Sequence, residues 1–327
     1  MKFRKEQLDI LIKKISQLRV LVIGDVMVDS YIKGKVERIS PEAPVPVVNV
    51  SSRELRLGGA ANVALNVKSM GAAPVLVSMV GDDESGHQFR KMLKQEGIAE
   101  QGILLSGKRR TTLKSRVMSV NQQLLRFDEE DTDALDPIDR RTLIDHINSL
   151  MPDCDLVIVE DYDKGCLDDE VISELIKSAQ INSKFVAVDP KKKNFHKYQE
   201  VDLFKPNLRE LCEGLEQEVD PTSTDDLIRA TDRLYDSIAF KNALITLSSD
   251  GIFYTGQDTG NEPAELRNIS DVSGAGDTVI AVASLAMVAG FSLAESSALA
   301  NAAGGLVCEI PGVVPIDKDR LMQEVQS

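Results

Sequence analysis

Short apolar stretches alternate with longer patterned stretches along most of this chain. The apolar stretches are rich in Val, Ile and Leu and run into polar residues, as at residues 19–25, 74–83, 154–161, 185–191 and 243–247. Such runs predict buried strands. Helical spacing of apolar or small residues predicts helices between and after them, at residues 85–96, 137–150, 171–180, 227–240 and 296–308. Strands that alternate with helices predict an α/β fold with a doubly wound, mainly parallel sheet.

Two segments interrupt this pattern in the first half of the chain. Residues 33–50 combine β-branched residues with three prolines, and residues 111–119 alternate enough to be strands. Proline cannot donate to a central ladder, so residues 33–50 belong either to edge strands of a small accessory sheet or to an ordinary surface loop. Our interpretation is a single domain over residues 1–327, with a β-sheet lid formed by inserted segments near 31–50 and 111–127.

The sequence Asp-Val-Ser-Gly-Ala-Gly-Asp-Thr at residues 271–278 precedes an apolar, small-residue run at 279–290. The backbone can approach a ligand closely at three consecutive small residues, Gly274, Ala275 and Gly276. If the following run is a helix, its first N–H groups form an anion hole suited to a phosphate. Asp277 would lie beside those donors and could deprotonate an attacking hydroxyl. The alternative is an ordinary helix start with Asp277 as a first-turn charge partner.

Polar residues recur at the ends of the predicted strands: Asp25, Asp29, Asp82, Asp161, Asp189, Asn207 and Glu210. In a parallel sheet these ends share one edge, so the side chains are expected to converge on one crevice. Acids beside a phosphate hole suggest magnesium bound mostly through water, with Lys164 and Lys191 as candidates to neutralise phosphate. Each of the acids and amides has an alternative role as a helix cap.

Composition narrows the class of protein. The formal net charge of −14 argues against a nucleic-acid-binding surface. The longest apolar run, residues 279–291, is too short to span a membrane, and the N-terminus does not resemble a signal peptide. The four cysteines and three histidines are scattered, which makes a zinc site improbable. We therefore expect a cytoplasmic protein that binds neither nucleic acid nor membranes.

Two stretches resemble the signatures of the ribokinase-like (PfkB) sugar kinases: Gly-Gly-Ala-Ala-Asn at residues 58–62, which opens a predicted small-residue helix, and the sequence at 271–278. Within that family the chain is most similar to the heptose-7-phosphate kinases of lipopolysaccharide core biosynthesis. That closer similarity lies in four stretches, residues 24–29, 38–48, 119–126 and 161–165. The resemblance implies D-glycero-β-D-manno-heptose 7-phosphate as acceptor, ATP with Mg²⁺ as donor, and the 1,7-bisphosphate as product.

The resemblance also implies roles for individual residues. Asp277 matches the general base, and Gly274, Ala275 and Gly276 match the anion hole. Expected acceptor-binding residues are Asp29, Gly58, Gly59, Asn62 and Lys191. Expected nucleotide-binding residues are Asn207, Glu210, Thr246, Ser248, Gly251 and Asn301, with Glu210 also near the metal through water. The chain departs from the expected pattern after Lys191, where a second lysine stands in place of glycine.

Expectations about partners follow from the same resemblance. The lid is expected to build a homodimer, and whether a monovalent cation is required stays open. No His-x-Gly-His motif occurs, so adenylyl transfer is expected from a separate polypeptide. Two alternatives remain: a kinase for another sugar or sugar phosphate, such as ribose or fructose, and a catalytically silent nucleotide or sugar sensor. A dinucleotide-dependent oxidoreductase is disfavoured, because no Gly-x-Gly-x-x-Gly follows the early strand at residues 19–25.

Overall fold

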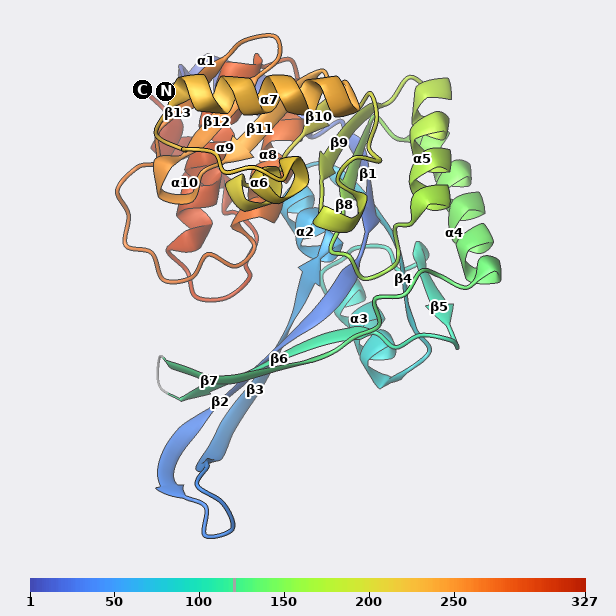
Figure 1. The fold of residues 1–327 in the computed structure, drawn as a ribbon, viewed down its shortest axis with the longest axis vertical. Coiled ribbons are helices and arrows are strands. Elements are labelled where there is room, and N and C mark those ends of the chain that lie inside the picture. Colours follow the sequence, from blue (N-terminus) through green and yellow to red (C-terminus); the bar gives the residue numbers. More distant parts are fainter. Residues whose placement is uncertain (120–121) are drawn as a thin grey trace.

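A computed structural model describes residues 1–119 and 122–327, and it contains two sheets (Figure 1). The larger sheet has the strand order β13-β12-β11-β10-β9-β8-β1-β4-β5. Neighbours are parallel from β11 through to β5, and β12 and β13 are antiparallel additions at one edge. Its strands are β1 (Arg19–Gly24), β4 (Ala73–Gly81), β5 (Ile103–Ser106), β8 (Leu156–Glu160), β9 (Phe185–Asp189), β10 (Leu203–Phe204), β11 (Asn242–Thr246), β12 (Ile252–Thr255) and β13 (Gly260–Glu262).

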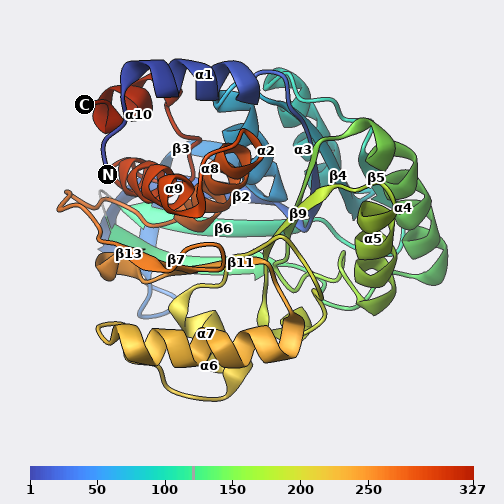
Figure 2. The ribbon, with the colours of Figure 1, turned by 90° about the horizontal axis from the view of Figure 1, so that it is seen from above.

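Helices cover both faces of this sheet (Figure 2). Successive side chains of a strand point to opposite faces, so Val20 and Val22 of β1 join one core cluster while Leu21 and Ile23 join the other. The first cluster includes α1 (Lys5–Ile15), α2 (Ala60–Ser69), α3 (Glu84–Gln95), α8 (Ala275–Val288), α9 (Leu293–Cys308) and α10 (Lys318–Val325). The second includes α4 (Pro137–Leu150), α5 (Asp169–Ile181), α6 (Leu208–Leu215) and α7 (Thr224–Ile238). The predicted doubly wound α/β fold is confirmed.

The smaller sheet projects from the body as a lid (Figure 1). Its strand order is β3-β2-β6-β7, where β2 spans Val26–Ile39, β3 Pro46–Gly59, β6 Thr112–Ser119 and β7 Gln122–Glu129. The pairing of β2 with β6 is parallel and the other two pairings are antiparallel. The lid strands are longer than the predicted segments, since β2 starts directly after Asp25 and β3 runs into α2. Residues 120–121, part of the 119–126 stretch on which the heptose resemblance partly rests, lie outside the described residues.

The helix expected at residues 296–308 begins earlier, at Leu293. Ser292 is its N-cap and exchanges hydrogen bonds with Glu295, a capping box that fixes the start. Asn301 is therefore in the middle of α9 and cannot act through a helix terminus. In the part of the chain that the structure describes, no helix combines the length and apolarity needed to cross a membrane.

Candidate active site

The first turn of α8 lies at the centre of the candidate site. Gly274 is the N-cap with φ of 80°, and a Cβ there would lie 2.7 Å from Nδ2 of Asn62. Only glycine adopts this backbone without strain and leaves room for the amide. A Cβ on Gly276 would instead meet nothing closer than Nζ of Lys205 at 3.5 Å, so the helix start is open on that side. The amide of Ala275 donates to the Val272 carbonyl at 3.3 Å, whereas the amides of Gly276 and Asp277 have no intrahelical partner and lie at the positive end of the helix dipole.

The Asp277 carboxylate is buried and bonded at both oxygens. Asn62 Nδ2 donates to Oδ2 at 2.7 Å, and the Tyr162 hydroxyl donates to Oδ1 at 2.8 Å. Burial raises the pKa of Asp277, while the two donors oppose that rise by stabilising the carboxylate. A carboxylate held in this way is oriented to accept a proton.

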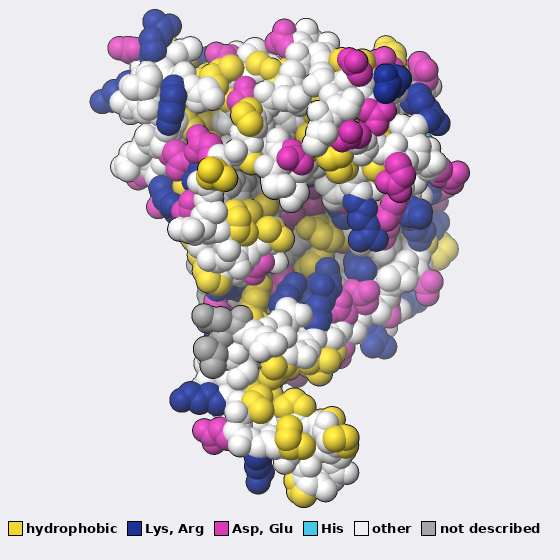
Figure 3. All heavy atoms as spheres, turned by 60° about the vertical axis from the view of Figure 1, so that its left-hand side comes forward, with side chains coloured by type: hydrophobic (Ala, Val, Ile, Leu, Met, Phe, Trp, Pro, Cys, Tyr) yellow, Lys and Arg dark blue, Asp and Glu magenta, His cyan; other side chains and the backbone are white. Residues whose placement is uncertain are grey.

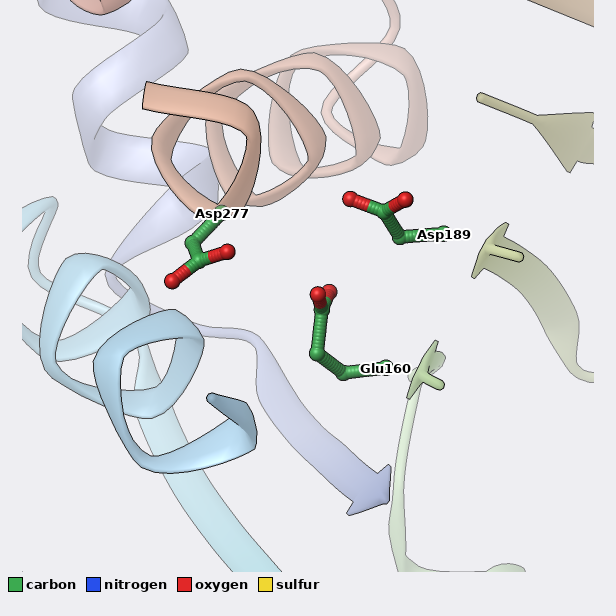
Figure 4. A group of neighbouring side chains, drawn as sticks. All are labelled: Glu160, Asp189 and Asp277. Atoms are coloured by element: carbon green, nitrogen blue, oxygen red, sulfur yellow. The ribbon is translucent and has the colours of Figure 1, made fainter. Parts of the chain in front are cut away.

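Three buried acids face one another across the end of the sheet (Figure 4). Glu160 ends β8, Asp189 ends β9 and Asp277 extends from α8, with one carboxylate oxygen of each within 4.8 Å of the others. Both oxygens of Glu160 are buried without a hydrogen-bond partner among the described residues. Burial, followed by the charges of Asp189 and Asp277, raises the pKa of Glu160 well above its ordinary value. Orphaned buried carboxylate oxygens in a close group are a donor set that fits a hard divalent cation.

Two lysines border the acids. Lys205 is only 2% exposed, and its ammonium lies 2.7 Å from Oδ2 of Asp189. The Lys191 ammonium lies 3.6 Å from Oδ1 of Asp189 and also pairs with Oε1 of Glu210. Burial lowers the pKa of Lys191, but the carboxylates of Asp189 and Glu210 outweigh it and raise that pKa overall. Both ammoniums therefore stay charged and can meet phosphate oxygens.

Asn207 and Glu210 form a capping box at the start of α6. Asn207 Oδ1 accepts from the Glu210 amide, and Glu210 Oε2 accepts from the Asn207 amide, each at 2.8 Å. With Lys191 on its other oxygen, the Glu210 carboxylate is fully engaged, and it is not part of the group of three acids. A metal role for Glu210 stays a prediction.

The remaining predicted nucleotide-binding residues lie around the turn between β11 and β12. A bridge pairs Asn207 with Thr246, and Ser248 begins a short 3₁₀ turn in the left-handed region with φ of 58°. Gly251 follows with φ of 92°, and a Cβ there would overlap the Glu262 carbonyl. Asn301 Nδ2 donates to the Pro263 carbonyl at 2.8 Å. These contacts lie around the turn between β11 and β12 and the segment that follows β13, and a shared nucleotide-binding role for these residues stays a prediction.

Four of the five predicted acceptor-binding residues gather at the root of the lid, whereas Lys191 lies after β9, beside Asp189 and Glu210. Asp29 lies on β2, and Gly58 lies beside it on β3, where a Cβ would overlap the Asp29 carboxylate. Gly59 is the N-cap of α2 with φ of 62°, which places Asn62 in the first turn of that helix. Arg116 on β6 donates to Oδ1 of Asp29 at 2.5 Å. Asn62 links this group to Asp277 through the hydrogen bond described above.

Residues 17–319 match the sequence profile described as pfkB family carbohydrate kinase. The chain belongs to this family. The prediction of a ribokinase-like sugar kinase is therefore confirmed.

Two curated relatives carry the name bifunctional protein HldE. The protein from Paramagnetospirillum magneticum is 38% identical over 321 residues, which cover 97% of this chain and 65% of that protein. The Helicobacter pylori (strain J99) protein is 41% identical over 290 residues, which cover 88% of this chain and 62% of that protein. This chain thus spans less than two thirds of the length of these relatives.

Solved structures show the same fold at low sequence identity. The tetrameric inhibited form of Escherichia coli phosphofructokinase-2 superimposes with a TM-score of 0.77 at 19% identity, covering 94% of this chain and 99% of that one. Arabidopsis thaliana ribokinase, complexed with ribose and ATP, gives 0.73 at 16% identity, with 95% and 99% coverage. At these identities the likeness shows the fold alone.

Some of the acids predicted at strand ends have other roles than in the candidate active site. Asp25 accepts hydrogen bonds from the amides of Tyr162, Lys164 and Cys166, so it holds the loop after β8. Asp161 accepts from Tyr198 and Asn194, and burial raises its pKa to about 6. Asp82 lies outside the site, in an exposed pair with His87. Lys164 pairs with Glu130 at 2.9 Å.

Sequence reasoning did not assign roles to four side chains that the structure brings to the site: Glu160, Tyr162, Lys205 and Lys114. Lys114 on β6 is 8% exposed, and none of the described residues accepts a hydrogen bond from its ammonium, which lies 5.2 Å from the centre of the Tyr162 ring. Burial lowers the pKa of Lys114. Two of these four residues could have been noticed in the sequence: Glu160 as an acid next to Asp161, and Lys114 as a lysine within an alternating strand.

Proposed function

We propose that this chain transfers the γ-phosphoryl group of ATP to the anomeric hydroxyl of D-glycero-β-D-manno-heptose 7-phosphate, giving the 1,7-bisphosphate. The observation that carries the proposal is the buried Asp277 carboxylate, oriented by two donors at an open helix start. It lies between the predicted acceptor residues at the lid and the acids and lysines at the ends of β8, β9 and β10. The similarity to heptose-7-phosphate kinases in the lid and loop stretches supports the acceptor.

The chain's own residues supply positioning and charge stabilisation. Asp277 orients the acceptor hydroxyl and takes its proton as the oxygen attacks phosphorus in line with the leaving group. The first-turn amides at Gly276 and Asp277 stabilise negative charge on the transferred group, because they have no helical partner and lie at the positive end of the helix dipole. Lys191 and Lys205 offset the charge of the donor phosphates and the acids around them.

Magnesium fits the carboxylate oxygens that have no hydrogen-bond partner among the described residues, which are both oxygens of Glu160 and Oδ1 of Asp189. Glu160 and Asp189 would hold the cation, directly or through water, with Asp277 and Glu210 close by. When bound, the cation neutralises charge on the phosphates of the nucleotide. Until then the three carboxylates repel one another in a buried space, which matches the raised pKa of Glu160.

Lys114 supports an acceptor that carries its own phosphate. In the lid register Lys114 is paired with Asp29, so its side chain is on the face of the lid that carries the predicted acceptor residues. Lys and Arg side chains gather in the hollow between the lid and the body (Figure 3). Arg116 and Lys164 are already paired with Asp29 and Glu130, whereas Lys114 has no acceptor among the described residues. A largely buried lysine whose ammonium has no acceptor favours an anionic ligand.

We also propose that the other face of the lid binds the lid of a second copy. Leu55 and Phe127 lie in one row of the sheet through Ser30 and Ser115, and Leu125 lies in the next row on the same face. All three apolar side chains are exposed. Yellow hydrophobic side chains are visible on the lid in Figure 3.

The proposal is tested by a coupled ADP-release assay over an acceptor panel. The panel contains heptose 7-phosphate, fructose 6-phosphate, fructose and ribose, in potassium and in tetramethylammonium salts, which also determines whether a monovalent cation is needed. We expect the highest kcat/KM with heptose 7-phosphate. A preference for an unphosphorylated sugar would overturn the acceptor, and nucleotide binding without transfer to any acceptor would favour the sensor alternative.

A further inference from the structure

The loop that follows β8 carries Tyr162, whose hydroxyl donates to Oδ1 of Asp277 at 2.8 Å. This loop is tightly held. Oδ2 of Asp25 accepts from the amides of Tyr162 and Lys164 at 2.9 and 3.0 Å, and its Oδ1 accepts from the amide of Cys166 at 3.0 Å. The backbone of Tyr162 is thereby fixed relative to β1, the strand that Asp25 directly follows.

The ring of Tyr162 is fixed as well. The ammoniums of Lys114, from the lid, and of Lys191, from the segment after β9, each lie 5.2 Å from its centroid. Cations at this distance are attracted to the ring, so both lysines restrict its orientation. The hydroxyl is therefore presented to Asp277 from a phenol whose backbone and ring are both restrained.

Two donors are needed to fix a carboxylate. The last torsion of an aspartate side chain is broad, so the hydrogen bond from Asn62 to Oδ2 alone leaves the carboxylate free to turn about its terminal bond. A second donor on Oδ1, from a separate loop, removes that freedom. Small errors in the direction of a catalytic base are costly, because the reacting atoms must be held close and aligned.

We infer that Tyr162 is a positioning residue that aims the Asp277 carboxylate at the acceptor hydroxyl. The inference rests on the proposed function, in which Asp277 is the base. The alternative is a purely structural role, in which the phenol only supplies a hydrogen bond to a buried carboxylate and does not affect catalysis. Tyr198 offers that case for comparison, since its buried hydroxyl donates at 2.6 Å to Asp161, a carboxylate with no part in the proposed transfer.

The experiment compares Tyr162→Phe, Tyr198→Phe, Asp277→Asn and the double variant Tyr162→Phe/Asp277→Asn. Each is assayed for kcat and KM with ATP and heptose 7-phosphate, with enzyme in excess for the slow variants. We expect Tyr162→Phe to lower kcat by about 10- to 100-fold while both KM values change by less than about 3-fold. Tyr198→Phe should leave kcat within about 3-fold of the wild type, although both phenol variants lose stability.

The double variant separates a positioning role from a structural one. If Tyr162 acts through the Asp277 carboxylate, Tyr162→Phe changes kcat by less than about 2-fold once Asp277 is asparagine. An equal loss of kcat in both backgrounds, or the same kcat for Tyr162→Phe and Tyr198→Phe, would overturn the inference. Wild-type kcat in Asp277→Asn would instead overturn the proposed base. Assays run below the lowest melting midpoint of the set, so that every variant is compared folded.

Discussion

Asn62 Nδ2 donates a 2.7 Å hydrogen bond to Oδ2 of Asp277, joining residues 215 positions apart in the chain. Each lies in the first turn of a helix that follows glycine, α2 after Gly59 and α8 after Gly274. Both glycines have positive φ, so the two chain segments turn sharply into their helices and bring the helix starts together. The two glycine-containing motifs of the sequence are thus halves of one structure around a single carboxylate.

Replacing Asp277 by asparagine should abolish most transfer without unfolding the protein. The amide keeps the size of the side chain but cannot take a proton, so kcat should fall by about 10²- to 10⁴-fold. Binding of a non-hydrolysable ATP analogue, measured by calorimetry, should be largely kept.

Asp271→Asn is the matched control. The Asp271 carboxylate belongs to the same motif but accepts from the amides of Ser273 and Gly312, each at 2.9 Å, away from Asp277. Its replacement should lower the melting temperature and leave kcat within about 10-fold of the wild type, because it removes hydrogen bonds but no proton acceptor. Near-normal turnover in Asp277→Asn would rule out the assigned base.

Alanine at Gly274 should lower stability, whereas alanine at Gly276 should lower activity and leave stability unchanged. A Cβ at Gly274 meets a positive φ and lies 2.7 Å from Asn62, so Gly274→Ala should cost about 1–3 kcal/mol of unfolding free energy. A Cβ at Gly276 makes only ordinary contacts, so Gly276→Ala should melt near the wild-type temperature. Because that methyl group enters the opening at the helix start, kcat should still fall, by about 10-fold or more. Full activity of stable Gly276→Ala would contradict an anion hole there.

The sequence predicted the sheet, the helix at residues 279–290 and the lid, because each depends on local patterning. It singled out Asp161 instead of Glu160 for a physical reason. Adjacent strand residues point to opposite faces, and which of two neighbouring acids faces α8 depends on how β8 pairs with β1, where Glu160 is opposite Gly24. That pairing joins segments far apart in the chain and has no local signature.

Lys114 was missed for a similar reason. Its environment is created by the parallel pairing of β6 with β2, which places it opposite Asp29. Without that register an alternating lysine is read as solvated surface. Tyr162 becomes informative only when the loop that carries it is bound to Asp25.

Glu160→Gln should stabilise the metal-free protein and weaken its response to magnesium. In EDTA the variant removes one of three mutually repelling buried acids, so the melting temperature should rise by about 2–6 °C. Magnesium should raise the wild-type melting temperature, because a ligand that binds only the folded state stabilises it, and should raise that of the variant much less. Glu213→Gln, at a partly exposed pair with Arg209, is the control and should keep the magnesium response. An unchanged response in Glu160→Gln would exclude this acid from the cation site.

Lys114→Met should weaken binding of the acceptor and stabilise the folded protein. Removing a buried ammonium that lacks an acceptor should raise the melting temperature by about 2 °C or more. It should also raise KM for heptose 7-phosphate by about 10- to 100-fold, with little change for ATP or for an unphosphorylated sugar. Lys35→Met, at an exposed lid position, should change neither quantity. Equal KM effects on phosphorylated and unphosphorylated acceptors would argue against phosphate recognition by Lys114.

The pH dependence of these effects has a defined sign. Burial lowers the pKa of Lys114 below the ordinary lysine value of 10.5, so the folded state loses this proton at lower pH than the unfolded chain. The stability penalty is therefore fully present below the folded pKa and disappears as pH rises toward 10.5, and the advantage of Lys114→Met should shrink over that range. Wild-type KM for heptose 7-phosphate should rise over the same range, as the ammonium is lost, while that of the variant stays flat.

The double variant Leu125→Asp/Phe127→Asp should separate lid-linked dimers. Leu125 is 57% exposed and Phe127 is 42% exposed on the face of the lid turned away from Lys114, so the substitutions disturb no buried contact within one chain. In a dimer the same positions are desolvated, and uncompensated carboxylates there oppose association. Sedimentation equilibrium should give the mass of two chains for the wild type and of one chain for the variant. Ile181→Asp, at an apolar position on α5 that is even more exposed, should leave the dimer intact. A wild-type monomer at micromolar concentration, or a dimer insensitive to both lid substitutions, would refute this interface.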